Sequence, residues 1–229
     1  QVAAWVFQEL DRHVRCTIVC HDGQDVRAGE TLLWLEGPAR SILSAERTAL
    51  NFLGHLSGVA TLTRQCVACV SPYPTVVLDT RKTLPGLRAL ERFAVRVGGG
   101  KNHRLGLGDV ILIKTNHLRA GRTTVEAAIR RAKRVVHGRR VQVEVQNLAE
   151  LEAALRAHPH VMMLDNWTVP AIRRAVTLRN AHGRRPLLEV SGKVSLANVR
   201  QVARTGVDRI SIGRLTHSAP MLDVSLQVR

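Results

Sequence analysis

The chain has 229 residues, enough to bury a substantial core as one large domain or as one large and one small domain. Hydrophobic residues make up 45% of it and aromatic residues only 3%, so we expect a core of Val, Leu, Ile and Ala. The apolar runs are too short for a membrane helix, and the first residues do not resemble a signal peptide. We therefore predict a cytoplasmic globular protein without a membrane partner.

The basic residues give the chain a formal net charge of +16, and only five of its 34 Lys and Arg residues are lysine. A charge of this size raises the alternative of nucleic-acid binding through phosphate contacts. However, the basic residues are scattered apart from one cluster within 130–140, and no aromatic binding motif accompanies them. We interpret the charge as an arginine-rich surface and expect no nucleic-acid partner. Salt-sensitive retardation of DNA would support the alternative.

The four cysteines form two closely spaced pairs, Cys16 with Cys20 and Cys66 with Cys69. The second pair has the spacing of a metal or redox motif, but it lies in an apolar, helix-like run. A zinc site would require the two pairs to meet in space. We expect buried free thiols instead, which fits a reducing compartment.

Residues 1–43 are predicted to form a small α+β sandwich that is incomplete at its start. The chain opens at Gln1 in the middle of a helix-like pattern, which indicates that residues are missing before it. Two strand-like runs follow, separated by turn signals at Asp22-Gly23 and Ala28-Gly29. We expect the C-terminal segment 219–229 to join this unit.

Residues 44–218 are predicted to form an α/β barrel. A helix begins at Ser44, which we expect to be its N-cap, and extends to about Cys69. Short apolar runs then alternate with helical stretches, which favours parallel strands in a barrel, with an open doubly wound sheet as the alternative. The runs are 75–79, 110–114, 141–145, 161–165, 187–191 and 209–213, and the helices are 86–97, 123–136, 148–157, 169–178 and 195–204.

Charged side chains follow several of these apolar runs. In α/β barrels the catalytic groups lie at the carboxyl ends of the strands, so we expect these residues to share one site. Charged groups in such positions need partners or ligands. Two of the runs end in cationic groups, and a glycine run at 98–100 between them is followed by two more such residues. Together these cationic or potentially cationic side chains favour a small, heavily anionic substrate; they are Arg81, Lys82, His103, Arg104 and Lys114.

Two carboxylates, Glu144 and Asp165, form the acidic part of the predicted site. Carboxylates without neighbouring Cys or His ligands suit Mg²⁺, which often bridges to substrate phosphates. Glycine-containing turns at Ser191-Gly192-Lys193 and Ile212-Gly213-Arg214 offer backbone N–H groups to a phosphate. The set as a whole indicates group transfer from a phosphorylated, pyrophosphorylated sugar.

The chain resembles the family of nicotinate-nucleotide pyrophosphorylase (carboxylating), also called quinolinate phosphoribosyltransferase. The matching motifs are long and follow the family order over nearly the whole sequence. They are LEGPARSILSAERTALNFLGHLSG (35–58), LDTRKTLPGLR (78–88), GGGKNHRLGL (98–107), ILIKTNHL (111–118), VEV (143–145), MLDN (163–166), LEVSG (188–192) and GVDRISIGRLTHS (206–218).

The resemblance implies a pentosyltransferase of NAD biosynthesis. Such an enzyme joins quinolinate to phosphoribosyl pyrophosphate with Mg²⁺ and gives nicotinate mononucleotide, pyrophosphate and CO₂. The implied fold is an N-terminal sandwich followed by an α/β barrel that is incomplete relative to the eightfold type. A homodimer or higher homo-oligomer is also implied.

By the same resemblance, residues of the motifs take on individual roles. Arg81, His103 and Arg104 would bind the quinolinate carboxylates. Arg47 would do so from the partner subunit. The remaining substrate-binding residues are Thr80, Lys82, Lys114, Glu144, Asp165, Ser191, Gly192, Lys193, Ile212, Gly213 and Arg214. Among them Lys82, Lys114, Glu144 and Asp165 would be catalytic, and Glu144 and Asp165 would bind Mg²⁺.

Four residues depart from the family pattern. Thr115, Gln142 and Gln146 stand where acidic residues are usual, and Arg214 replaces a small residue. The family's opening segment, including a G-D-x-T stretch, has no counterpart before Gln1. The alternatives are therefore a paralogue that acts on another anionic base and a catalytically impaired fragment of the same fold.

Overall fold

The computed structural model describes residues 1–135, 138–183 and 185–228. Residue 136 of the predicted helix 123–136 and residue 229 of the C-terminal segment lie outside these ranges. Among the described residues, no helix combines the length and the apolar character needed to cross a membrane.

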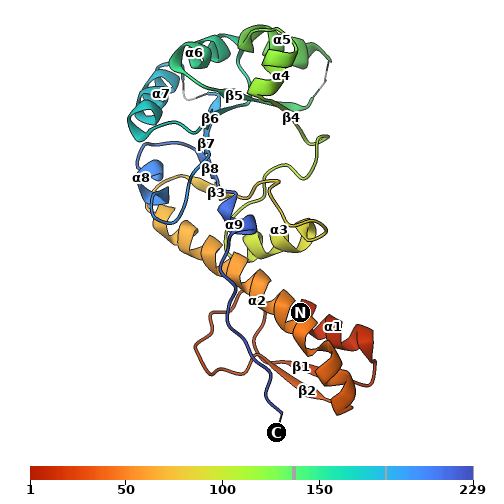
Figure 1. Ribbon diagram of the computed structural model, residues 1–229. Coiled ribbons are helices and arrows are strands. Elements are labelled where there is room, and N and C mark those ends of the chain that lie inside the picture. Colours follow the sequence, from red (N-terminus) through yellow and green to blue (C-terminus); the bar gives the residue numbers. More distant parts are fainter. Residues whose placement is uncertain (136–137, 184, 229) are drawn as a thin grey trace.

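Six parallel strands curve into an arc, with helices along its outer side (Figure 1). The strand order is β3-β8-β7-β6-β5-β4, so β3 and β4 are the two edges where a closed barrel would pair them. The prediction of an incomplete barrel rather than a doubly wound sheet is confirmed. The strands are β3 (Val76–Leu78), β4 (Val110–Ile113), β5 (Arg140–Val145), β6 (Val161–Asp165), β7 (Leu187–Ser191) and β8 (Arg209–Ser211).

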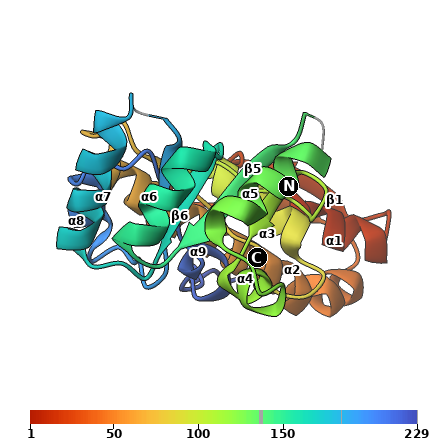
Figure 2. The ribbon, with the colours of Figure 1, turned by 90° about the horizontal axis from the view of Figure 1, so that it is seen from above.

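The helices of the barrel follow the strands in alternation, as predicted, and α6, α7 and α8 lie on the side away from α1 (Figure 2). Two short helices, α4 and α9, directly follow strand ends. The barrel helices are α3 (Arg88–Val97), α4 (Thr115–Ala120), α5 (Val125–Val135), α6 (Leu148–Ala157), α7 (Val169–Ala181), α8 (Val199–Ala203) and α9 (Arg214–His217).

Strand β5 shows why these apolar runs form a sheet with two different faces. Its Val141, Val143 and Val145 side chains are fully buried in the core that includes α5 and α6. The alternate residues Gln142 and Glu144 point to the opposite face, because successive side chains of a strand alternate. One face of the strand therefore stabilises the fold, and the other presents polar groups.

The N-terminal unit packs around a second, smaller core. It contains helix α1 (Val2–Leu10) and an antiparallel pair, β1 (Arg15–Ile18) with β2 (Leu33–Glu36). Phe7 from α1 and Val14 pack against two alanines of the long helix α2 (Ala39–Val70), namely Ala45 and Ala49. Helix α2 then continues into the barrel core, so one helix joins the two units.

Helix α2 begins six residues earlier than an N-cap at Ser44 predicts. Pro38 is its N-cap residue, with φ −61°, and Ser44 lies inside the helix, where its hydroxyl donates to the Arg40 carbonyl at 2.7 Å. The prediction of Ser44 as the N-cap is wrong. A serine is common at N-caps, but a serine inside a helix can instead bond to the carbonyl four residues earlier, and the sequence does not distinguish the two cases. The predicted division between residues 43 and 44 falls within this helix.

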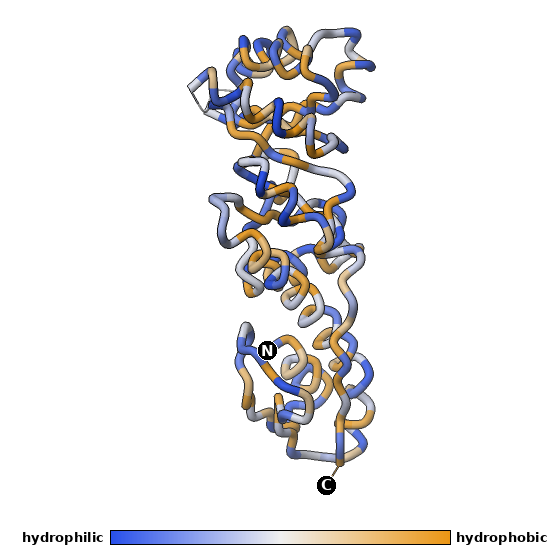
Figure 3. Tube along the Cα trace, turned by 90° about the vertical axis from the view of Figure 1, so that its left-hand side faces the viewer, coloured by the Kyte–Doolittle hydropathy of each residue, from blue (hydrophilic) through white to orange (hydrophobic). Residues whose placement is uncertain are grey.

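The C-terminal segment lies along α2 and reaches the N-terminal unit (Figure 3). Two glycines of α2 permit this close approach: a Cβ on Gly58 would lie 1.9 Å from the Pro220 carbonyl, and one on Gly54 would lie 2.8 Å from that of Leu222. The N–H of Leu222 donates to the Gly54 carbonyl at 3.0 Å. Farther along, Leu226 packs against the second core.

The cysteines are free thiols in both units. Cys66 is buried in the barrel core, and burial raises its pKa to about 11. Cys16, Cys20 and Cys69 are only partly buried, so the expectation of buried thiols holds for Cys66 alone.

Candidate active site

The strand ends bring residues that are distant in sequence to one edge of the sheet. Asp165 lies opposite Ser191 in the register of β6 and β7, and Ser191 lies opposite Ser211 in β8. The N–H of Ile212 donates to the Leu78 carbonyl at 2.9 Å, which joins the end of β8 to the end of β3. The loops after β3, β6, β7 and β8 therefore meet at the carboxyl edge, where α/β barrels carry their active sites.

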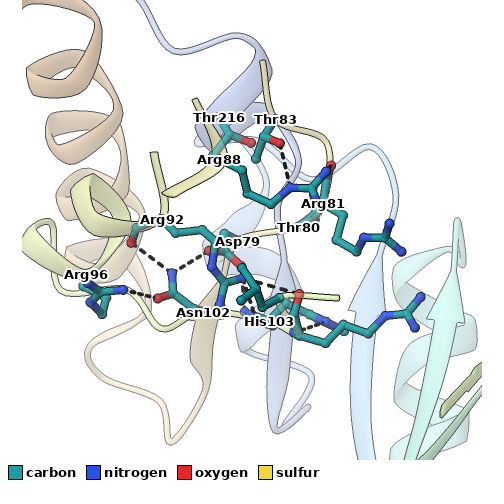
Figure 4. Close-up of polar contacts among 12 residues, drawn as sticks. Asp79, Thr80, Arg81, Thr83, Arg88, Arg92, Arg96, Asn102, His103 and Thr216 are labelled. Atoms are coloured by element: carbon teal, nitrogen blue, oxygen red, sulfur yellow. Dashed lines mark hydrogen bonds and ion pairs between the residues drawn. The ribbon is translucent and has the colours of Figure 1, made fainter. Parts of the chain in front are cut away.

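Asp79, directly after β3, is fully buried and binds the segment that follows α3 (Figure 4). One carboxylate oxygen accepts the backbone N–H of His103 at 2.6 Å, and the other accepts the Asn102 amide. The Arg92 guanidinium lies 3.6 Å from the carboxylate and donates to the His103 carbonyl at 2.8 Å. Burial raises the pKa of Asp79, while these hydrogen bonds and the Arg92 charge oppose the rise. Asp79 thus fixes the backbone that carries His103 and Arg104.

The glycine run 98–100 allows this segment to pass close to α2. A Cβ on Gly98 would lie 2.4 Å from the carbonyl of Ala60, so only glycine fits there. The chain then forms a short parallel bridge between Lys101 and Leu78 of β3. The glycines therefore position the segment rather than contribute chemistry to the site.

The imidazole of His103 is engaged through both ring nitrogens. Its Nδ1 accepts the backbone N–H of Arg104 at 2.7 Å, and its Nε2 lies 3.1 Å from Oε1 of Glu189 on β7. Glu189 is fully buried. The structure thus places His103 at the predicted site, with its polar atoms bound to other residues of the chain.

Arg81 and Arg104 place two guanidinium groups near each other. Arg81 is exposed and extends away from α3 and from the hydrogen bonds around Asp79 (Figure 4). Arg104 is partly buried and donates one N–H to the Val110 carbonyl at 3.1 Å. Burial and the charge of Arg81 lower the pKa of Arg104, which nearby carboxylates partly counteract. Two cations that repel each other at the edge of a site favour binding of an anion between them.

Lys114 and Glu144 meet at the ends of β4 and β5. The Lys114 ammonium lies 3.8 Å from Oε1 of Glu144, whose Oε2 accepts the backbone N–H of Thr115 at 3.1 Å. The His117 ring accepts the Lys114 N–H at 3.0 Å and closes the turn into α4. Because Lys114 remains half exposed while Glu144 is mostly buried, the carboxylate is fixed and the ammonium is available to a ligand.

Asp165 is oriented by its neighbour Asn166, whose amide donates to the carboxylate at 3.0 Å. The backbone N–H of Asn166 donates to the carbonyl of Ser191 at 2.9 Å. Gly192 lies so close that a Cβ there would be 2.3 Å from Oδ1 of Asn166, and its φ is +88°. The following residue, Lys193, also has a positive φ, of 50°, and is exposed. The acidic group after β6 and the predicted phosphate turn after β7 are therefore packed together.

Lys82 lies against the second predicted phosphate turn. A Cβ on Gly213 would be 3.0 Å from Cδ of Lys82. The hydroxyl of Thr80 accepts the Lys82 N–H at 3.1 Å, and the hydroxyl of Thr216 donates to the Lys82 carbonyl at 2.7 Å. The backbone of Lys82 is thereby fixed from both sides, while its side chain stays exposed.

Two predicted residues stand apart from these contacts. Arg214 is exposed at the first position of α9. Arg47 is exposed on the part of α2 whose buried residues, Ala45 and Ala49, belong to the N-terminal core rather than to the barrel core. Within one chain, the structure does not bring Arg47 to the barrel edge.

Several residues of the site were not predicted, and they are mainly buried polar groups. The sequence identifies Asp79 only as a polar residue at a strand end, and Glu189 and Asn166 only as parts of longer motifs. A carboxylate within or directly after an apolar strand could have identified Asp79 and Glu189, because a buried charge requires partners.

A cavity of about 340 Å³ lies elsewhere in the molecule. It is lined by the loop 19–32 region, α2 and α3, and it includes Leu56, Phe93 and Val97. None of the predicted site residues lines it. The site is therefore assigned from its charges and hydrogen bonds and not from enclosed volume.

No three His, Cys, Asp or Glu side chains gather into a metal cluster in the described part of the chain. Glu144 and Asp165, on neighbouring strands, are the predicted oxygen ligands. Mg²⁺ commonly binds through one or two protein carboxylates together with substrate phosphates. Their oxygen chemistry would suit a Mg²⁺ ion that is shared with a phosphorylated substrate.

Matches to known proteins extend over both the N-terminal unit and the barrel. Residues 1–57 match the N-terminal domain of quinolinate phosphoribosyl transferase, and residues 59–227 match its C-terminal domain. The nicotinate-nucleotide pyrophosphorylase [carboxylating] of Mycobacterium leprae is 45% identical over 207 residues, covering 90% of this chain and 72% of the relative. A probable nicotinate-nucleotide pyrophosphorylase [carboxylating] of Bacillus subtilis is 40% identical, covering 97% of this chain and 76% of the relative.

A solved structure agrees with this assignment. The nicotinate-nucleotide pyrophosphorylase from Francisella tularensis superposes with a TM-score of 0.92 at 43% identity, covering 99% of this chain and 80% of that one. Domain matches, relatives and fold agree over nearly the whole chain, and the chain belongs to the quinolinate phosphoribosyl transferase family.

Proposed function

We propose that this protein transfers the phosphoribosyl group of phosphoribosyl pyrophosphate to quinolinate. The products would be nicotinate mononucleotide, pyrophosphate and CO₂, which makes the protein a pentosyltransferase of NAD biosynthesis. The printed names of relatives, including tobacco quinolinate phosphoribosyltransferase [decarboxylating], support this reaction. A cytoplasmic location is part of the proposal, because nothing in the sequence requires an oxidising compartment.

The observation that carries the proposal is the pair Arg81 and Arg104. Burial and the positive charge of Arg81 lower the pKa of Arg104. Lys114 adds a third cation near Glu144. Quinolinate carries two adjacent carboxylates, and a guanidinium binds a carboxylate through two parallel hydrogen bonds. Binding of the dianion would offset the repulsion between the two arginines and fix the pyridine ring beside the sugar.

The acidic residues suit the other half of the reaction. Departure of pyrophosphate leaves positive charge on the ribose ring, which carboxylates at Glu144 and Asp165 would stabilise. Both carboxylates are already oriented, Glu144 by the Thr115 N–H and Asp165 by the Asn166 amide. Such preorganised groups need little rearrangement when the charge develops.

The cations would stabilise negative charge on the substrates. Lys82 lies against Gly213 in one predicted phosphate turn, and Lys193 follows Gly192 in the other. We assign the 5′-phosphate to these turns and the pyrophosphate to the neighbouring lysines. Loss of CO₂ leaves negative charge on the pyridine ring, which the Lys114 ammonium would stabilise.

Magnesium enters the proposal through the acidic pair. Glu144 and Asp165 would bind Mg²⁺ together with the diphosphate oxygens of the substrate. The ion would neutralise charge on the departing pyrophosphate. Two carboxylates would leave most of the coordination shell of Mg²⁺ to waters and substrate oxygens.

The function is tested by incubating the protein with phosphoribosyl pyrophosphate and either quinolinate or nicotinate, with and without Mg²⁺. The proposal predicts mononucleotide and CO₂ from quinolinate only, and a loss of both products in EDTA. Turnover of nicotinate, or mononucleotide formation without CO₂, would show that the protein acts on a base other than quinolinate. Binding of phosphoribosyl pyrophosphate without turnover of either base would indicate a catalytically impaired member of the family.

We further propose a dimer in which Arg47 completes the partner's site. A groove of about 550 Å³ lies between α1 and the part of α2 that contains Ala45 and Thr48, and Trp5 and Leu10, both more than half exposed, line it. Burial of these apolar side chains against a second copy would stabilise such a dimer. Mixing inactive Arg47→Ala and Lys114→Ala chains should restore activity in hybrid dimers. Two inactive variants that stay inactive on mixing would contradict a role for Arg47 in the partner's site.

A further inference from the structure

Glu189 is a buried carboxylate for which the proposed reaction has no use so far. It lies on β7, is fully buried, and is paired in the strand register with Met163 on one side and Arg209 on the other. Oε1 lies 3.1 Å from Nε2 of His103, and Oε2 has no hydrogen-bond partner among the described residues. Burial of a carboxylate is costly, so a residue of this kind requires a structural or functional reason.

The hydrogen bonds around His103 define the protonation of its ring. The backbone N–H of Arg104 can only donate, so Nδ1 of His103 must be the acceptor in their 2.7 Å contact. The ring proton therefore lies on Nε2, where it donates to Glu189. The contact with Glu189 thus selects the Nε2–H tautomer of the ring.

The ring of His103 connects Glu189 to the backbone of Arg104. The His103 backbone is fixed independently, because its N–H donates to Asp79 and its carbonyl accepts from Arg92. The orientation of the ring is then set by its own contacts, and its Nδ1 binds the first backbone atom of Arg104. If the His103 ring rotated, the Arg104 N–H would lose its acceptor, and the Arg104 guanidinium would shift together with its backbone.

We propose that Glu189 is a positioning residue of the quinolinate site. It acts through His103, fixing the imidazole in the Nε2–H form so that Arg104 is held where a substrate carboxylate binds. This inference rests on the proposed function, since it concerns the affinity of the same site for quinolinate. A displacement of about 1 Å in such a group is enough to weaken binding or catalysis strongly.

The chain contains a second histidine–glutamate pair that serves as a matched control. His55 of α2 binds the fully buried Glu91 of α3, with 2.8 Å between Nε2 and Oε1. The pairing and the burial resemble those of His103 with Glu189, but His55 does not precede a cation of the site. Glu91 also accepts the backbone N–H of Leu84 at 3.2 Å, so the control variant has to leave Glu91 in place. Loss of the control pair should therefore lower stability without the same change in quinolinate binding.

The experiment measures the dissociation constant of quinolinate by calorimetry without phosphoribosyl pyrophosphate. Glu189→Met removes the acceptor at similar length and should raise that constant about tenfold or more, since a buried N–H loses its partner. Glu189→Gln retains an acceptor oxygen and should stay within about threefold of wild type. His55→Phe removes the control contact while Glu91 keeps the Leu84 N–H, and it should lower the unfolding temperature but leave the constant within about threefold.

A second measurement does not depend on the folding of any variant. Ring ¹⁵N chemical shifts of His103 in the wild-type protein should show protonated Nε2 and unprotonated Nδ1 at neutral pH. An imidazolium or the Nδ1–H tautomer would overturn the proposal, as would unchanged quinolinate affinity in a folded Glu189→Met protein. If wild type binds no quinolinate while the ring shows the expected tautomer, the proposed function fails rather than the role of Glu189 in fixing the ring.

Discussion

The backbone N–H of Thr115 donates to the Glu144 carboxylate at 3.1 Å. The sequence comparison with the family predicts an acidic residue at position 115, yet the contact that orients Glu144 uses the main chain. Replacement of the acid by threonine therefore leaves this contact in place. The departure at Thr115 does not by itself remove a part of the site.

This contact can be removed without changing the helix that follows. Thr115 is the first residue of α4, where proline is tolerated, and Lys114 before it has the extended backbone that precedes proline. Thr115→Pro deletes only the N–H donor and should lower kcat/KM about tenfold. Thr115→Ala keeps the donor and should retain activity within about threefold, as measured by mononucleotide formation.

The two arginines of the anion site should show their role in the KM for quinolinate. Arg81→Ala and Arg104→Ala should each raise that KM about tenfold or more, because each loses charged hydrogen bonds to the substrate. The KM for phosphoribosyl pyrophosphate should change much less. Arg134→Ala removes an exposed arginine on α5 and serves as the control for net charge. An equal rise in the quinolinate KM in all three variants would show a general charge effect instead.

Gly192 should be replaceable only at a high cost in stability. Its φ of +88° disfavours any side chain, and a Cβ would lie 2.3 Å from Oδ1 of Asn166. Gly183 has a similar φ of +82°, but a Cβ on it would meet no other atom of the described residues within 4 Å. Gly183→Ala should therefore cost about 1 kcal/mol from backbone strain alone.

Gly192→Ala adds the steric clash to that strain and should cost roughly 2–4 kcal/mol in urea unfolding. The displaced Asn166 amide would also release Asp165, so the KM for phosphoribosyl pyrophosphate should rise. Equal destabilisation by both alanines would mean that Asn166 moves aside freely.

Asp11 links stability to pH in the N-terminal unit. The Ser41 hydroxyl, then the His13 backbone N–H, lower its pKa from the usual 3.8 to about 2. Because the folded-state pKa is depressed, this carboxylate stabilises the fold above pH 3.8, and its contribution is lost as the pH falls towards 2. Ser41→Ala should raise the pKa of Asp11 in carboxyl-detected NMR titration. An unchanged value would exclude Ser41 as the main cause.

The barrel could be predicted from sequence because its signals are local. Runs such as 161–165 combine apolar residues with a charged end, and each is followed by a helical pattern of the expected length. The start of α2 was mispredicted because Ser44 hydrogen-bonds within its own helix, whereas the actual start at Pro38 depends on the fixed φ of proline.

The site was predicted in part for the same reason. Lys114 and Asp165 end apolar runs and Glu144 lies inside one, and such positions are visible in sequence. The roles of Asp79 and Glu189 depend on contacts with residues 24 and 86 positions away in the chain. Pairings over such separations are set by tertiary packing, so spacing along the sequence carries no signal for them.

The most direct test of the account is CO₂ release from carboxyl-labelled quinolinate in the presence of phosphoribosyl pyrophosphate and Mg²⁺. The wild-type protein should release CO₂ in step with mononucleotide formation. Lys82→Ala and Lys114→Ala should each reduce the rate by about a hundredfold or more while unfolding at an unchanged temperature. Wild-type protein that releases no CO₂, or lysine variants that release it at the wild-type rate, would contradict the account.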